Sequence, residues 1–222
     1  MFDTREYKTI RLSKTAGQEI SPAAYNLIIG AALLFGIGID MMMAIYMQEP
    51  ILHMSLLAVI LIYFAGSLLC TAIIYHSDSP VISFLGFTGL SVCMGLLITF
   101  AVSSYTAGTV AYAFGMTGLV TVLMMLLAAV FPRFFLGLGR TLFLSLLAAV
   151  AVELIFRLLL GFAMNFMDYL VALLFAGFIG YDWSRAQAYP KTVDNAIDSA
   201  ADIFVDIIGL FLRILSITGD RN

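Results

Sequence analysis

Four aspartates near the end of the chain recur at a spacing of four residues: Asp194, Asp198, Asp202 and Asp206. On a helix, side chains at this spacing lie along one stripe, where like charges repel. The stripe runs into an apolar stretch, residues 207–212. Ionisable residues inside a hydrocarbon-embedded segment are costly, and by default they mark a path for ions or protons. The stripe therefore indicates movement of protons or cations.

A fifth aspartate, Asp182, ends an uncharged run that begins at Tyr169. If its helix packs beside the last helix, its carboxyl group can meet that of Asp206. Two close carboxylates cannot both ionise cheaply, so one keeps a proton and the pair titrates as a unit. The sequence predicts a proton-sharing gate at Asp182 and Asp206. When deprotonated, their hard oxygens suit Ca²⁺. The competing interpretation of Asp182 is a solvated charge at a helix end.

The other aspartates of the stripe fit a role at the cytoplasmic entrance. Asp194 and Asp198 are expected on a solvated helix face, and Asp202 could belong to either environment. Together the three would form a vestibule that concentrates cations.

A second ionisable group lies in other apolar segments. Glu153 and Arg157 stand four residues apart and can pair on one helix face, and Asp40 could share Arg157. We interpret this set as a structural ion pair that holds the helices together. Its expected position in the outer half of the membrane also allows a role as the external mouth of a pore.

The composition is that of an integral membrane protein. Of the 222 residues, 62% are hydrophobic and 11% charged, whereas soluble domains carry about 25% charged residues. The net charge of −3 is small and dispersed, which argues against nucleic acid as a partner. Cys70 and Cys93 fall in apolar runs and are expected to be buried hydrophobes. Since there is no phosphate-binding loop, nucleophile–base pattern or haem motif, we expect neither a cofactor nor an enzyme.

Five prolines mark most of the boundaries between apolar segments. They predict a tail, residues 1–21, and one helical membrane domain, residues 22–222. The predicted spans are about 23–47, 54–75, 81–102, 108–131, 140–160 and 164–182. Lys and Arg in the tail and alternate loops place both termini in the cytoplasm. We expect a monomer in the lipid bilayer.

The seventh apolar segment, about 193–217, differs from the other six. Its uncharged core between Asp206 and Arg213 has only six residues, which is too short for a crossing. The predicted fold is therefore an all-α integral membrane protein. Six transmembrane helices surround a seventh, C-terminal helix that is half-inserted or central.

Two motifs carry a family resemblance. They are Gly180-Tyr181-Asp182 at the end of the sixth span and Ile203–Leu215 in the last segment. In these residues the chain resembles the Bax inhibitor motif family. The resemblance implies a seven-helix pH-sensitive calcium leak channel or Ca²⁺/H⁺ exchanger. Asp182 and Asp206 would be its gate, with Asp206 beside the pore, and Ca²⁺ and H⁺ would be the transported ions.

The chain also departs from that family. Gly209 stands where the family usually has Asn. Some members place Arg at the cytoplasmic end of the second span, where it pairs with the first gate aspartate. This chain has Tyr75-His76-Ser77-Asp78 there, so a protonated His76 would have to act as the latch. Short loops and the absence of a sorting signal suggest the bacterial plasma membrane.

Two other functions are compatible with the sequence. The protein could regulate other membrane proteins without transport, as a protease modulator does. It could also be an intramembrane aspartyl protease, because a Tyr-Asp pair on a sixth span occurs in that class. The second hypothesis lacks its Gly-x-Gly-Asp motif, since the chain reads Phe204-Val205-Asp206.

Overall fold

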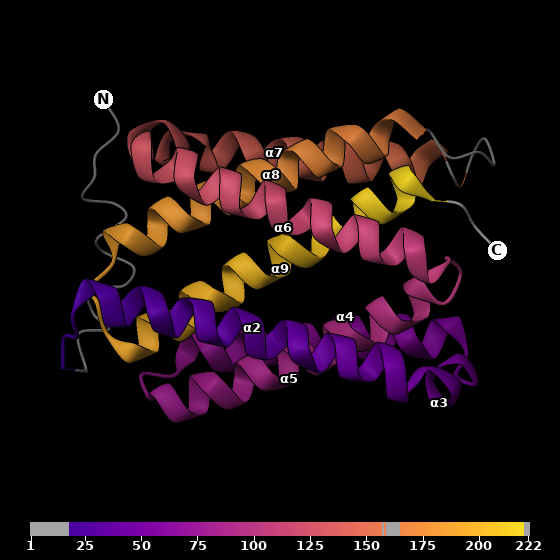
Figure 1. The fold of residues 1–222 in the computed structure, drawn as a ribbon, viewed down its shortest axis with the longest axis horizontal. Coiled ribbons are helices and arrows are strands. Elements are labelled where there is room, and N and C mark those ends of the chain that lie inside the picture. The colour runs from indigo at the N-terminus through magenta and orange to yellow at the C-terminus, as the bar shows by residue number, and fades with distance from the viewer. Residues whose placement is uncertain (1–17, 157, 159–164, 220–222) are drawn as a thin grey trace. The chain divides into compact units, whose positions relative to one another are not determined.

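The computed structural model describes residues 18–156, 158 and 165–219. Regular structure in this part of the chain is helical (Figure 1). The helices form two compact units. The first comprises Met1–Ser104 and Ala186–Phe204, and the second comprises Tyr105–Arg185 and Val205–Asn222.

Six of the described helices are long and apolar enough to cross a membrane. They are α2 (Pro22–Tyr46), α4 (Leu56–His76), α5 (Pro80–Val102), α6 (Ala107–Val130), α7 (Pro132–Ile155) and α8 (Asn165–Ala188). The prediction of an all-helical protein with six long apolar helices is confirmed.

Helix starts follow from capping side chains and proline. The hydroxyls of Ser21, Ser55 and Thr106 each accept a hydrogen bond from a backbone N–H three residues later, at 3.2 Å. These bonds satisfy donors that the first turns of α2, α4 and α6 would otherwise leave open. Proline stands at the first position of α2, α5 and α7, where its missing N–H costs nothing.

Two helix bounds and one loop differ from the prediction. α7 begins at Pro132 and not near residue 140, because proline starts a helix and the sequence after it stays apolar. α8 continues to Ala188 and not 182, since the polar residues after Asp182 still form helical turns. The expected loop after α2 contains a short helix, α3 (Gln48–Leu52).

In the first unit, α5 packs against both α2 and α4. The α2–α5 contact is close at Gly36. A Cβ added there would lie 2.9 Å from atoms of Phe87 and Ser91 of α5 and of Phe204. The rings of Phe87 and Phe204 meet edge to face, with centroids 5.4 Å apart. Glycine therefore makes room on α2 for this aromatic pair.

Tyr25 of α2 joins the start of that helix to the turn before the last helix. Its buried hydroxyl lies 3.1 Å from the Ala186 carbonyl oxygen and 3.1 Å from the Ser199 hydroxyl. The Lys191 ammonium lies 4.5 Å from the Tyr25 ring centroid and donates to the carbonyls of Ala186 and Gln187. Burial lowers the pKa of Lys191. The junction thereby satisfies carbonyls at the end of α8.

Replacing Tyr25 with phenylalanine is expected to lower the free energy of unfolding by about 1–3 kcal/mol, because buried polar groups lose their partner. Equilibrium unfolding in mixed micelles measures the change. Tyr112→Phe is the matched control, since Tyr112 is exposed. Equal stability of the two variants would contradict the assigned contribution of the Tyr25 hydroxyl.

In the second unit, large side chains of α7 and α8 pack onto glycines of the opposite helix. The pairs are Phe135 with Gly180, Tyr181 with Gly139, and Leu142 with Gly177. Each ring or branched side chain occupies space that a Cβ would need, so the two helices approach closely. The residue after Tyr181 is Asp182, and this interface fixes its position within the unit.

The last helix, α9 (Val193–Thr218), belongs to both units. Thr192 starts it, because its hydroxyl accepts a hydrogen bond from the Asn195 N–H at 3.2 Å. Many of its side chains are buried, including Ala200, Ile203 and Leu210. α9 is not among the six helices that could span a membrane by length and composition. Its half-inserted or central position stays a prediction.

Candidate functional site

Asp182 is buried on α8 and forms an ion pair. Its Oδ1 lies 3.0 Å from Nη2 of Arg185, one turn further along the same helix. The Arg185 guanidinium also lies over the Tyr181 ring, 5.4 Å from its centroid. A solvated charge at a helix end is thus the wrong interpretation of Asp182. The three-residue spacing of Asp182 and Arg185 is the sequence signal that would have found this pair.

Asp206 is buried on α9, in the same unit as Asp182. Its level along α8 follows from two contacts. Phe175 packs on Gly209, and Asp168 accepts a hydrogen bond from Ser216. Seven residues forward on α8 therefore correspond to seven residues back on α9, which is an antiparallel register.

This register brings Asp182 and Asp206 to similar depths in the second unit. Asp182 lies seven residues after Phe175 on α8. In this register, the position of α9 that is level with Asp182 lies four residues before Asp206. Four residues span about 6 Å along a helix axis. Side chains tilt toward the N-terminus of their own helix. An antiparallel pair with this offset is compatible with the predicted meeting of the two carboxyl groups, which stays a prediction.

Two other aspartates of the stripe, Asp194 and Asp198, are not on a solvated face. Asp194 and Asp198 are buried, with 4% and 0% of their surface exposed. Ser83 of α5 donates a hydrogen bond of 2.7 Å to Asp194, and Tyr75 of α4 donates one to Asp202. The expectation of a solvated face failed because these partners lie more than 100 residues away in the sequence. The vestibule role of Asp194, Asp198 and Asp202 stays a prediction.

His76 makes a local contact. Its Nδ1 lies 2.8 Å from the carbonyl oxygen of Ala72, one turn earlier on α4. Its role as a latch for the gate stays a prediction. The structure adds a second cation to consider, because Arg185 already pairs with Asp182.

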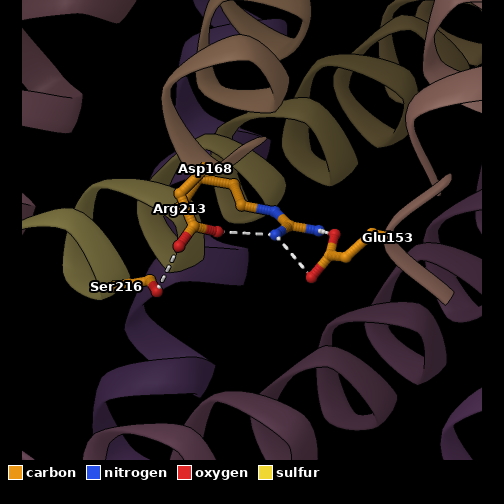
Figure 2. Close-up of polar contacts among 4 residues, drawn as sticks. All are labelled: Glu153, Asp168, Arg213 and Ser216. Carbon is orange, nitrogen blue, oxygen red and sulfur yellow. Dashed lines mark hydrogen bonds and ion pairs between the residues drawn. The ribbon is translucent and has the colours of Figure 1, made fainter. Parts of the chain in front are cut away.

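An interhelical ion network, not anticipated from the sequence, lies in the second unit. Figure 2 shows Arg213 of α9 between Glu153 of α7 and Asp168 of α8. Its Nη2 lies 3.0 Å from Glu153 Oε2, and its Nη1 lies 2.7 Å from Asp168 Oδ1. Ser216 donates a 2.8 Å hydrogen bond to the other Asp168 oxygen. All three charged side chains are mostly buried.

The predicted partnership of Asp40, Glu153 and Arg157 stays a prediction. Arg157 lies outside the described residues, and Glu153 pairs with Arg213. Asp40 belongs to the first unit, where its Oδ1 would lie 3.1 Å from a Cβ added at Gly95. It is buried, and neither of its oxygens has a hydrogen-bond partner within the described part of the chain.

Among the described residues, no three His, Cys, Asp or Glu side chains gather in a group that could hold a metal ion. Ca²⁺ usually takes six to eight oxygen ligands. The predicted contact of Ca²⁺ with Asp182 and Asp206 stays a prediction.

Comparison with known proteins gave one result for nearly the whole chain. Residues 18–222 match the family model described as "Inhibitor of apoptosis-promoting Bax1". The matched range contains both Asp182 and Asp206. A comparison with curated proteins found no match.

Proposed function

Because the chain belongs to the Bax inhibitor family, we propose that it is a pH-sensitive path for Ca²⁺ across a membrane. It acts as a leak channel or as a Ca²⁺/H⁺ exchanger, and not as an enzyme. The family and the six long apolar helices fit a multi-pass membrane protein. We assign it to the bacterial plasma membrane because its loops are short, and we place its N-terminus in the cytoplasm on the distribution of Lys and Arg.

One observation carries the proposal. Asp182 and Asp206 are both buried in the same unit, on antiparallel helices whose register offsets them by one turn. Two carboxyl groups that meet bind one proton between them more readily than either would alone. With that proton lost, the pair carries two negative charges and attracts a divalent cation. Arg185 balances part of that charge at Asp182.

Protonation of the pair would therefore change the attraction for Ca²⁺ inside the path. It would also weaken the hold of Asp182 on Arg185, since a neutral acid no longer attracts a guanidinium. Either change couples the proton concentration to ion passage. The Asp194–Ser83 and Asp202–Tyr75 hydrogen bonds help to hold α9 within the first unit.

Neutralising Asp206 is expected to remove the pH dependence of Ca²⁺ flux and to reduce flux at least about tenfold. A tenfold change in flux corresponds to about 1.4 kcal/mol in the free energy of ion passage. A single contact between a carboxylate and a cation at close range in a protein contributes more than that. The purified protein is reconstituted in liposomes that contain a Ca²⁺ indicator, and flux is measured over a pH series. Asp206→Asn and Asp182→Asn are compared with Asp78→Asn, which changes an exposed carboxylate.

The outcomes separate the candidate functions. Flux through Asp206→Asn that equals wild type at every pH would refute the gate. A wild type that carries no Ca²⁺ but retains a bound membrane protein through purification would favour a non-transporting regulator. Cleavage of a model membrane substrate, abolished by Asp182→Ala, would favour an aspartyl protease.

A further inference from the structure

Cys70 of α4 and Cys93 of α5 pack reciprocally in the first unit. A Cβ added at Gly89 of α5 would lie 2.7 Å from the Cys70 sulfur. A Cβ added at Gly66 of α4 would lie 2.5 Å from the Cys93 sulfur. Each thiol occupies the space that a glycine leaves open on the opposite helix.

These two contacts define the local register of α4 and α5. Four residues forward on α4, from Gly66 to Cys70, correspond to four residues back on α5, from Cys93 to Gly89. Because side chains tilt toward the N-terminus of their own helix, the two thiols lean toward each other in this antiparallel pair. Both are free thiols.

The surroundings of the thiols are apolar, and they are open on one side. Most of α4 is exposed; its buried side chains are Val59 and Ile74. Cys70 is half-buried, and Cys93 is buried. In a bilayer the exposed side of α4 faces hydrocarbon, so a lipid-soluble reagent can reach Cys70 more readily than Cys93.

We propose that Cys70 and Cys93 form a redox-active dithiol that a lipid-soluble quinone oxidises to a disulfide between α4 and α5. The two thiols lose two protons and two electrons, and a bond forms between their sulfurs. The same protons and electrons convert the quinone to its hydroquinone. The bond locks α4 to α5, and a thiol reductant reverses it by thiol–disulfide exchange.

This role differs from the one expected of cysteines in apolar runs, which is to fill space. Space filling requires only small side chains and does not require that two thiols meet. A disulfide requires the Cα atoms to approach within about 7 Å, and close packing against glycine is what allows two helices to come that near. The proposal is independent of Ca²⁺ transport.

The test uses the full chain in lipid nanodiscs treated with a short-chain benzoquinone. The protein is then denatured, alkylated with N-ethylmaleimide and weighed by mass spectrometry. Untreated protein is expected to take up a label on both cysteines. Oxidised protein should lose both labels, weigh less by the mass of two hydrogens, and recover both labels after dithiothreitol. Peptide mapping should then link Cys70 to Cys93 within one chain.

Two variants test whether disulfide formation depends on the position of the Cys70 thiol on α4 and not only on its contact with the lipid phase. Cys70→Ser should leave Cys93 fully labelled after quinone treatment. The double variant Cys70→Ser with Leu69→Cys moves the thiol about 100° around α4, onto an exposed position, and should form no internal disulfide. The proposal is overturned if the wild type keeps both labels or forms disulfides only between copies. It is overturned equally if the relocated thiol oxidises as readily as Cys70.

Discussion

Replacing Arg213 with methionine is expected to lower the free energy of unfolding by about 3 kcal/mol. The substitution keeps the apolar length of the side chain but removes the guanidinium that Glu153 and Asp168 share. Breaking a buried ion pair by removal of one partner costs about 3–5 kcal/mol, because the remaining charge stays buried without compensation. The charged side chains here are 14–22% exposed, so water access places the expected loss near the lower end.

The network makes a second, sharper test possible. If the loss comes from uncompensated carboxylates, the triple variant Arg213→Met with Glu153→Gln and Asp168→Asn should recover most of the stability, since no net charge remains buried. Arg140→Met is the matched control, because Arg140 is exposed on α7. Equilibrium unfolding in mixed micelles gives all four values. An Arg213→Met protein as stable as Arg140→Met would show that the network contributes little.

The Arg213 network also shows what local sequence patterns cannot reveal. Glu153 and Arg157 are four residues apart, and such a spacing predicts a pair on one helix face. The structure pairs Glu153 with Arg213, 60 residues away. The contact of Glu153 with Arg213 depends on the packing of distant helices, which a local spacing does not describe. The identity of Asp168 and Ser216 as partners follows from the same packing.

The helices, by contrast, could be predicted closely. Their ends depend on residues that act within one turn, such as Ser21 with Pro22 and Thr106 as caps. Hydropathy over about 20 residues is likewise a local property. Burial of Asp194 and Asp198 could not be predicted, since it depends on hydroxyl groups and apolar surfaces from distant helices. The aspartate spacing identified a stripe but not its environment.

The glycine in the last helix illustrates the same limit. In sequence, Gly209 is a departure from the Asn that its family usually has at this position. In the structure, a Cβ added at Gly209 would lie 2.5 Å from two ring atoms of Phe175 on α8. Glycine is therefore explained at this position, because the aromatic ring of Phe175 fills the space that a side chain at position 209 would take.

Gly209→Asn is consequently expected to lower the free energy of unfolding by about 2–3 kcal/mol, because overpacking forces side chains from their rotamers and shifts the backbone. The control is Gly137→Asn, the same change in α7 where nothing lies within 4 Å of the added Cβ. It should change stability far less. Similar losses in the two variants would mean that an asparagine in an apolar helix, and not the clash with Phe175, is the cause.

A double-mutant cycle separates the clash from other effects. Phe175→Ala alone removes the packing of the ring. In the Gly209→Asn background it also removes the clash. The double variant should therefore lose less free energy of unfolding than the sum of the two single losses. Contacting residues give coupling energies of about 0.5–3 kcal/mol. Gly209 is three residues after Asp206, and Phe175 is seven before Asp182. If Gly209→Asn changes the pH dependence of Ca²⁺ flux, relief of the clash by Phe175→Ala should therefore bring that pH dependence back toward the wild type. Additive losses in the cycle would show that Phe175 and Gly209 do not set the spacing of α8 and α9.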